Sequence, residues 1–305
     1  MQVVYISNRP NIFAETLQHV ALFMPFIDKA IVCAPDSLVP QFQQLSPHLS
    51  LDVVPESSVL SSEEMTNIFS LDHQRRNYLL RNRLINSDKV DAQFIMSDDD
   101  ARPLKPVTIE TFITDGRYRR YFFYDLADWD NNQTEFDLGQ ISTHAVLDYE
   151  NLEHLSYASH MPQIVDRELF IDSTRFFQLH AKQHPLCEWS SYFNYASNKY
   201  PEKFHPPEAF LTLCWPEHPQ AWKYYIEPAS SMFENYTPSL YQNKRVFASF
   251  KTAAESHAQL VQMNIKKIIL WKNYSIYCLY PERTKGIAKY LRLRTWINKL
   301  RSQAV

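Results

Sequence analysis

Glycine is scarce in this chain of 305 residues: it occurs only at Gly116, Gly139 and Gly286, and no two of these lie near each other. Soluble proteins contain about 7% glycine on average, so the deficit is large. Dinucleotide-binding and P-loop folds need clustered glycines, because backbone N–H groups must approach the phosphate closely. The sequence has no such loop. If the chain binds a nucleotide, a metal ion and Arg or Lys side chains must neutralise the phosphates.

Closely spaced cysteines and long apolar runs are also missing. The four cysteines form no C-x-x-C pair, which argues against a zinc site and a disulfide framework and predicts reduced, packed thiols. No run of about 18 apolar residues occurs, and the segment MQVVYISNRP lacks the pattern of a signal peptide. We therefore expect neither a transmembrane helix nor a signal peptide, and a cytoplasmic protein. The cysteines are Cys33, Cys187, Cys214 and Cys278.

Alternating strand and helix patterns fill the first third of the chain, and 45% hydrophobic residues are enough for a sizeable core. Strands are predicted at VVYIS (3–7), KAIVCAPD (29–36), SLDVVPE (50–56) and AQFIMS (92–97). Helices are predicted at NIFAETLQHVALFMPFI (11–27) and HQRRNYLLRNRLI (73–85). A helix between two strands implies parallel pairing, because parallel neighbours need a crossover connection. We predict an α/β fold with a Rossmann-type sheet.

Three consecutive aspartates follow the fourth predicted strand, in FIMSDDDARPL (94–104). Adjacent carboxylates raise each other's proton affinity, so a positive partner is expected. Asp98, Asp99 and Asp100 lie at the carboxyl end of a strand, which is where open α/β sheets bind their ligands. A D-x-D pair offers oxygen ligands to a hard divalent cation that can also hold a diphosphate. We predict Mn²⁺ or Mg²⁺ bound by Asp98 and Asp100.

Two other interpretations of the aspartates remain open. The segment could be a solvated acidic turn or a helix start. Phosphatases of the haloacid dehalogenase type also place D-x-D after a strand, but usually on their first strand and with Thr or Val following. Here the motif lies on about the fourth strand, and Ala101 and Arg102 follow it. This difference argues against the phosphatase, and the apolar run before the aspartates and the scarcity of glycine favour a metal site over a turn.

The composition changes after residue 105. The segments RYRRYFFYDLADWD, WSSYFNYASNKYP and AWKYYIEP are rich in aromatic residues, and most of the 18 prolines lie in short turns. We predict strands and loops that fold over the sheet edge and supply a pocket wall. No repeat or low-complexity linker marks a boundary, so residues 1–245 are taken as one domain with halves 1–105 and 106–245.

Residues 246–305 form a separate C-terminal segment. Its last forty residues, 266–305, contain ten Lys or Arg and one acidic residue, which leaves 21 basic and 33 acidic residues elsewhere. A helical projection that starts at Ile287 places Leu293, Trp296 and Leu300 on one side, and basic residues flank this side. This pattern predicts an amphipathic helix on an anionic membrane surface, with docking on the protein's own acidic body as the alternative. Nucleic acid is not expected as a partner, because the rest of the chain is acidic.

The segments VVYISNRP, KAIVCAPD, RRNYLLRNRL and FIMSDDD, in this order, resemble glycosyltransferases of the A-type (GT-A) fold. HMPQIVDRELF (160–170) and CEWSSYFNYASNKYP (187–201) look like segments of bacterial surface-polysaccharide transferases, including the Stealth sugar-phosphate transferases. The resemblance implies a metal-dependent transfer of sugar from a nucleotide-sugar donor to a lipopolysaccharide or capsule glycan, at the inner face of the cytoplasmic membrane. A sugar-phosphate transferase and a non-catalytic glycan-binding or membrane-binding protein are the alternatives.

Arginines are the candidates for contact with the donor diphosphate. Arg9 lies at the end of the first strand. The four arginines of the helix at 73–85 cannot all face one ligand, because a helix rotates by about 100° per residue. We favour Arg76 and expect the others, Arg75, Arg81 and Arg83, to form a solvated face.

Further candidates follow from the segments at 160–170 and 187–201. His160 is expected to bind the metal or a phosphate, or to be a structural histidine. Arg167 is expected to bind the nucleotide sugar or acceptor, or to pair with Asp166. Glu188 lies in an aromatic setting that would raise its pKa toward that of a general base, with an exposed helix start as the alternative. Together, Asp98, Asp99, Arg9, Arg76, His160 and Arg167 form the predicted donor site, and Glu188 and Asp100 are the predicted catalytic residues.

Overall fold

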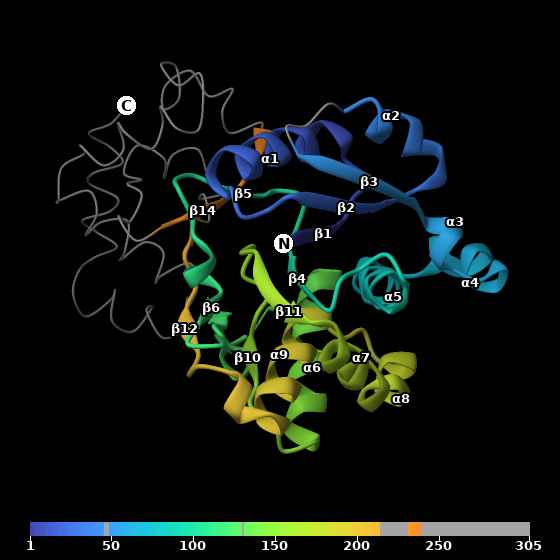
Figure 1. Cartoon of the computed structure of the whole chain (residues 1–305). Coiled ribbons are helices and arrows are strands. Elements are labelled where there is room, and N and C mark those ends of the chain that lie inside the picture. The colour runs from blue at the N-terminus through green and yellow to red at the C-terminus, as the bar shows by residue number, and fades with distance from the viewer. Residues whose placement is uncertain (46–48, 130, 214–230, 239–305) are drawn as a thin grey trace, which may run out of the picture. The chain divides into compact units, whose positions relative to one another are not determined.

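Five strands form the central sheet in a computed structural model of the chain, which describes residues 1–45, 49–129, 131–213 and 231–238. The strand order is β11-β4-β1-β2-β3, in which β1 to β4 are parallel and β11 runs antiparallel to β4 (Figure 1). The predicted α/β class and all four predicted strands are confirmed. Their bounds are β1 (Gln2–Ile6), β2 (Lys29–Ala34), β3 (Ser50–Pro55), β4 (Gln93–Met96) and β11 (Gln163–Asp166).

The inner strands are buried on both faces, which explains their nearly continuous apolar sequences. Helix α1 (Pro10–Phe23) connects β1 to β2 and covers one face (Figure 1). Phe13, Leu17 and Val20 recur at helical spacing on its buried side, and the ring of Phe13 meets that of Tyr5 of β1 edge-on at 5.0 Å. Periodicity in the sequence therefore becomes a packed helix–sheet interface.

Helix α5 (His73–Asn86), the predicted basic helix, lies on the other side of the sheet with α6 to α9 (Figure 1). The Asp72 carboxylate caps it by accepting a hydrogen bond from the backbone N–H of Arg75 at 2.8 Å. Its buried side contains Gln74 and Arg81 as well as apolar residues. A helix with polar groups on its buried face must satisfy them inside the protein.

The second half is more helical than predicted. In place of strands and loops, the structure has α6 (Glu135–Tyr149), α7 (Arg167–Phe176), α8 (Gln178–Gln183) and α9 (Glu188–Lys199). Helix α9 is buried almost all round, so its sequence lacks an amphipathic period, and its aromatic residues resemble those of strands. A capping box of Thr134 and Asp137 marks the start of α6.

Shorter elements complete the described part of the chain. The helices are α2 (Val39–Gln43), α3 (Glu56–Val59) and α4 (Ser62–Asn67). The strands are β5 (Ala101–Pro103), β6 (Ile113–Thr114), β7 (Arg117–Tyr118), β8 (Tyr121–Phe122), β9 (Tyr124–Asp125), β10 (Leu155–Ser156), β12 (Glu208–Ala209), β13 (Thr212–Leu213) and β14 (Phe233–Asn235).

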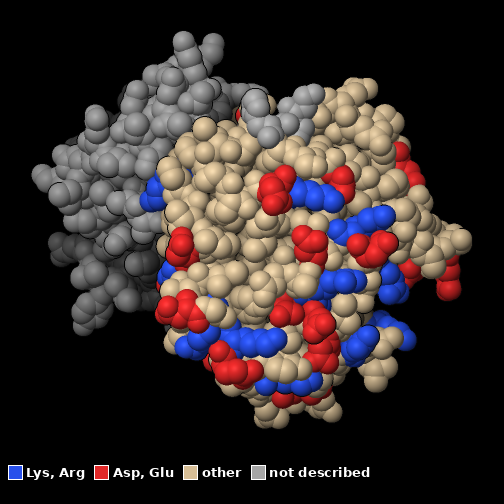
Figure 2. All heavy atoms as spheres, in the orientation of Figure 1, with Lys and Arg blue, Asp and Glu red and all other residues tan. Residues whose placement is uncertain are grey.

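The chain divides into two compact units, Met1–Thr212 with Met232–Tyr236 and Leu213–Ser231 with Thr237–Val305. Nearly all of the second unit, including the expected boundary at residue 245 and the expected basic helix, lies outside the described residues, and these expectations stay predictions. Within the described residues, Cys33 and Cys187 are buried free thiols, and no helix is long and apolar enough to cross a bilayer. On the face shown in Figure 2, basic and acidic side chains of the described part are interspersed.

Candidate active site

The carboxyl ends of β1 and β4 open onto a cavity of about 420 Å³. The order of the sheet reverses at β1, because β2 lies on one side of it and β4 on the other. Loops that leave a sheet at such a switch point diverge and form a ligand crevice. Ser7 and Arg9 follow β1, Asp98 and Asp100 follow β4, and all four residues line the cavity.

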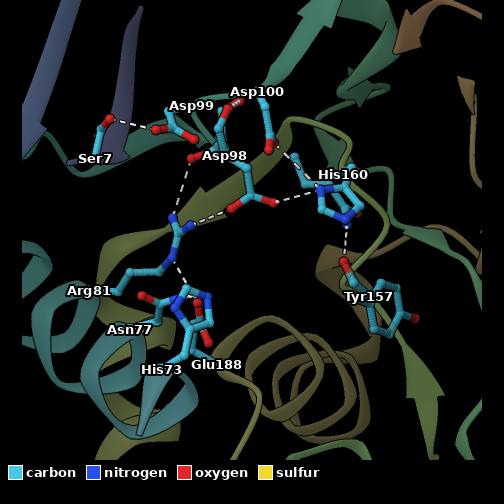
Figure 3. A network of polar contacts seen from close by, with 12 residues as sticks. Ser7, His73, Asn77, Arg81, Asp98, Asp99, Asp100, Tyr157, His160 and Glu188 are labelled. Atoms are coloured by element: carbon cyan, nitrogen blue, oxygen red, sulfur yellow. Dashed lines mark hydrogen bonds and ion pairs between the residues drawn. The ribbon is translucent and has the colours of Figure 1, made fainter. Parts of the chain in front are cut away.

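Two arginines of the chain pair with the three aspartates and offset part of their charge. Arg9 donates to Asp99 from Nε (3.1 Å) and Nη2, and to Asp100 from Nη2 at 2.8 Å. Arg81 donates from Nη2 to Asp98 Oδ1 at 2.6 Å (Figure 3). The positive partner that the triple aspartate requires is thus supplied, at least in part, by the protein.

Asp99 ties the ends of β1 and β4 together. Its carboxylate accepts from Ser7 Oγ at 2.5 Å as well as from Arg9, and its backbone carbonyl accepts from Thr16 Oγ1 at 2.6 Å. Burial raises the pKa of Asp99, and the arginine offsets only part of this effect. Because its oxygens are already bonded, Asp99 shapes the loop more than it offers ligands to the cavity.

Glu188, the first residue of α9, forms a buried ion pair with Arg81. The two side chains are 3% and 4% exposed, and Arg81 Nε donates to Glu188 Oε1 at 2.8 Å. Gln74 Nε2 donates to the other oxygen at 3.1 Å. Burial raises the pKa of Glu188, against the lowering effect of Arg81. With both oxygens engaged, Glu188 is placed to hold Arg81, which in turn holds Asp98.

His160 faces the two outer aspartates (Figure 3). Its Nδ1 lies 3.6 Å from Asp100 Oδ1 and 3.7 Å from Asp98 Oδ2. Although the ring is 38% exposed, Nδ1 is buried, and neither Nδ1 nor Asp100 Oδ1 has a hydrogen-bond partner. His160 has a φ of 45°, in the left-handed region that non-glycine residues adopt mainly where the surroundings impose it.

The same three groups shift each other's protonation. Burial alone would lower the pKa of His160, but the charges of Asp100 and Asp98 outweigh it and raise this pKa. Burial alone would raise the pKa of Asp100, but His160 and Arg9 outweigh it and hold that pKa below its usual range. The site is therefore arranged to keep Asp100 ionised beside a positive group.

The outer part of the cavity contains both charged and aromatic side chains. Arg76 Nη2 donates to the buried Glu56 carboxylate at 2.8 Å, and the guanidinium lies 5.7 Å from the Phe69 ring centroid. Phe136, at the start of α6, lines the cavity with 37% of its surface exposed. A half-exposed aromatic ring beside polar groups is a suitable platform for a sugar ring or a base.

The structure brings most of the predicted site residues to this one cavity, and one of them to another place. Arg167 starts α7 and donates to the backbone carbonyls of Ile85 (2.8 Å), Asn86 (3.3 Å) and Ser87 (2.7 Å) at the end of α5. It completes the C-terminus of that helix. Asp166 instead caps α7 by accepting from two of its backbone N–H groups. The predicted residues that line the cavity are Arg9, Arg76, Asp98, Asp99, Asp100, His160 and Glu188.

Arg81, Gln74 and Phe136 are among the cavity residues that the sequence did not predict. Arg81 was expected on a solvated face, but it is buried with Tyr78 and Ile85 at helical spacing, and this register was the available signal. Gln74 lies on the same side of α5. Phe136 follows the capping-box residue Thr134, which marks a helix start and says nothing about a cavity. In the part of the chain that the structure describes, no group of three or more His, Cys, Asp or Glu is already arranged as a metal site.

Comparison with known proteins gives only distant likenesses. No family model and no curated protein matches the sequence. Among solved structures, the apo form of mouse xyloside xylosyltransferase 1 shares 10% identity over 79% of this chain and 99% of that one, with a TM-score of 0.42. The galactosyltransferase LgtC in complex with donor and acceptor sugar analogs shares 9% identity over 87% and 98%, with a TM-score of 0.45. An active-site mutant of LgtC shares 10% identity over 87% of this chain and 98% of that one, with a TM-score of 0.43. The interpretation of the site rests on its own geometry.

Proposed function

We propose that the chain is a metal-dependent glycosyltransferase that transfers a sugar from a nucleotide-sugar donor to a glycan acceptor. The observation that carries the proposal is the pair of buried atoms Asp100 Oδ1 and His160 Nδ1, which lie 3.6 Å apart at the ligand-binding edge of the sheet, within ion-pair distance, and form no hydrogen bond. The distance is too long for a hydrogen bond. Two ligands of one ion, each about 2.1 Å from it, are about 3 to 4 Å apart.

Three side chains would supply the ligands of the proposed divalent cation. Asp98 Oδ2 completes a trio with Asp100 Oδ1 and His160 Nδ1, while Arg81 and Arg9 hold the other carboxylate oxygens. Two carboxylate oxygens and one imidazole nitrogen suit Mn²⁺, and Mg²⁺ less well because it favours an all-oxygen shell. When bound, such an ion would neutralise the diphosphate leaving group of the donor.

The chain's own residues supply the remaining charge and the positioning. Arg9 and Arg76 line the cavity beside the aspartates and are placed to contact the donor phosphates, which a chain without a glycine-rich loop cannot bind through clustered backbone amides. Arg81 and Glu188 fix the direction of Asp98 and act as positioning residues. Asp100 Oδ2 accepts from Arg9 and Oδ1 is the proposed metal ligand, so the catalytic role proposed for Asp100 is to hold the cation as an ionised carboxylate.

The acceptor is proposed from the cavity rim and from the sequence. The exposed ring of Phe136 offers a stacking surface for an acceptor sugar. The basic residues at 266–305 support a growing lipopolysaccharide or capsule glycan as acceptor, with the enzyme bound to the inner face of the cytoplasmic membrane. That segment lies outside the described residues.

A second candidate, sugar transfer without a metal, is favoured by one specific observation. Arg9 pairs with Asp99 and Asp100 and Arg81 pairs with Asp98, so two arginines of the site already bind acidic groups and could also hold a diphosphate. Metal dependence separates the two candidates.

The test is a screen of UDP-, GDP- and CMP-sugars for release of the nucleotide product, with Mn²⁺ and with EDTA, using simple glycosides as acceptors. Release in Mn²⁺ that EDTA abolishes, and that Asp100→Asn reduces by about 10² or more, supports the proposal. Asp172→Asn is the matched control, because this carboxylate lies on the surface of α7 and is paired with Lys199. Release that is equal in EDTA points to the arginine-only transferase, and no release from any donor contradicts both.

A further inference from the structure

A second hollow, of about 500 Å³, lies between α5, α7 and α8. Helix α5 contributes Arg75, Leu79 and Arg83 to it, and these residues fall on the side of the helix opposite to Gln74 and Arg81 because successive residues are rotated by about 100°. We call this hollow the α5–α7 groove. It is separate from the cavity at the sheet edge.

The α5–α7 groove is basic in a chain whose first 265 residues are acidic. Four Lys or Arg residues and one acidic residue, Glu64, line it, whereas residues 1–265 contain 21 basic and 33 acidic residues. Arg83 pairs with Glu64, and Arg75 pairs with Asp72 outside the groove. The other two basic residues, Arg175 and Lys182, are exposed.

Neither the side chain of Arg175 nor that of Lys182 has a hydrogen bond or ion pair with any residue that the structure describes. Both line the groove, Arg175 from α7 and Lys182 from α8. Two uncompensated cations at one rim attract an anion, and Arg in particular matches the geometry of a phosphate.

The floor of the α5–α7 groove is apolar. It contains Leu79, Ile171 and Leu186 together with the ring of Tyr78, which is 8% exposed. The hydroxyl of Tyr78 is buried and has no hydrogen-bond partner. With no exposed surface, this hydroxyl is not available to a ligand in the groove, which would contact the apolar side chains instead.

We propose that the α5–α7 groove binds an amphipathic anion, a phosphate ester joined to an apolar chain. The phosphate would bind Arg175 and Lys182, and the apolar chain would lie over the leucines and the tyrosine ring. The volume lies in the range of about 300 to 1,000 Å³ that is usual for small-ligand sites. The chain's own segment at 266–305 is an unsuitable occupant, because its ten basic residues would be repelled by the same rim.

This chemistry has two possible sources, a free phosphorylated amphiphile and the headgroup of an anionic lipid in a membrane. The inference does not depend on the proposed sugar transfer. Binding in the α5–α7 groove would nevertheless bear on the sugar transfer, because the ligand would contact helix α5, which carries Gln74, Arg76 and Arg81 to the candidate active site.

The test is calorimetric titration of the full chain with dodecyl phosphate below its micelle concentration, beside inorganic phosphate and neutral dodecyl maltoside. We expect one dodecyl phosphate per chain, bound more tightly than either of the other two. A second arm measures co-sedimentation with vesicles that contain phosphatidic acid. Binding of dodecyl phosphate in the first arm would show that a free amphiphile can occupy the groove. Binding in the vesicle arm alone would show that the ligand is a lipid headgroup in a membrane.

The double variant Arg175→Gln/Lys182→Gln should weaken binding by about tenfold or more in whichever arm is positive. Both side chains are exposed, so the fold should be retained, which circular dichroism checks. Lys89→Gln is the control, since this exposed lysine lines neither cavity. Because the double variant and the Lys89→Gln control share the basic C-terminal segment, any binding by that segment cancels when their affinities are compared. Unchanged affinity in the double variant, equal loss in Lys89→Gln, or no binding in either arm would overturn the inference.

Discussion

Asp100 Oδ1 and His160 Nδ1 lie 3.6 Å apart and are both buried, yet neither forms a hydrogen bond. The other oxygen of Asp100 is bonded to Arg9, so the carboxylate is held with one oxygen free and directed at the imidazole. Buried polar atoms without partners are rare in native proteins and mark places where something else binds. This pair marks the proposed position of the cation, and Arg9, Arg81 and Glu188 hold the aspartates around it.

Arg81→Gln should lower the free energy of unfolding by about 3 kcal/mol or more, because it leaves the buried Glu188 carboxylate without its charged partner. Arg83→Gln is the control on the same helix: its pair with Glu64 is 44% exposed at the arginine and should contribute about 0 to 1 kcal/mol. Urea unfolding of both variants measures the difference. Equal losses would show that Arg81 is not held as the structure places it.

Glu188→Gln should reduce turnover by less than about tenfold. As a general base, Glu188 would be needed for proton transfer, and its loss would reduce turnover by about 10² to 10⁴. The structure instead engages one oxygen with Arg81 and the other with Gln74, and a glutamine can still accept from the arginine. Steady-state kinetics on the active donor decides between the roles. A loss of 10² or more with unchanged donor affinity would restore the assignment as a base.

The stability of the protein should carry a pH signature of Glu188. Burial raises the pKa of Glu188 in the folded state above its ordinary value of about 4.3, against the opposing effect of Arg81. The folded protein then binds this proton more tightly than the unfolded chain. The favourable contribution is complete below the unfolded pKa and is lost as the pH rises through the folded pKa.

Relative to Glu188→Gln, the unfolding free energy of the wild type should therefore fall as the pH rises above about 4. Urea unfolding of both proteins from pH 4 to pH 7 measures the difference and cancels the groups that they share. A relative stability that increases with pH would mean that the ion pair with Arg81 outweighs burial.

Gly139→Ala should disturb the candidate site from a distance. A Cβ at Gly139 would lie 2.9 Å from Cγ of Gln74, the side chain that donates to Glu188. We expect a loss of about 1 to 3 kcal/mol, as for other overpacked positions. Gln74→Ala removes the obstacle, so the two substitutions should be coupled by about 0.5 kcal/mol or more in a double-mutant cycle. Additive effects would show that the contact is relieved without cost.

The first half of the fold could be predicted because its strands are buried on both faces. That burial gives continuous apolar runs such as KAIVCA and QFIM, and the turn signals between them mark the crossovers. Helix α9 was missed for the corresponding reason: buried nearly all round, EWSSYFNYASNK has no polar side to reveal a helical period.

The candidate site could be predicted only where a residue lies beside a strand end. Asp98, Asp100 and Arg9 follow their strands directly, so topology alone brings them together. The position of Arg81 depends on which side of α5 is buried, and its register with Tyr78 and Ile85 is the signal in the sequence. Arg167 is a residue type that often binds anions. Its position after β11, however, directs its side chain to the backbone carbonyls at the end of α5.

Direct binding of Mn²⁺, measured by electron paramagnetic resonance with and without UDP, GDP or CMP, tests the central claim most directly. Asp100→Asn and His160→Asn each remove one proposed ligand, and asparagine tolerates the left-handed backbone at position 160. Asp172→Asn is again the control, because this carboxylate is already paired with Lys199. The account predicts one Mn²⁺ per chain in the wild type and the control, strengthened by the matching nucleotide and weakened by about tenfold or more in the two ligand variants. Equal Mn²⁺ affinity in all four proteins, or no binding in the wild type under any of these conditions, would contradict it.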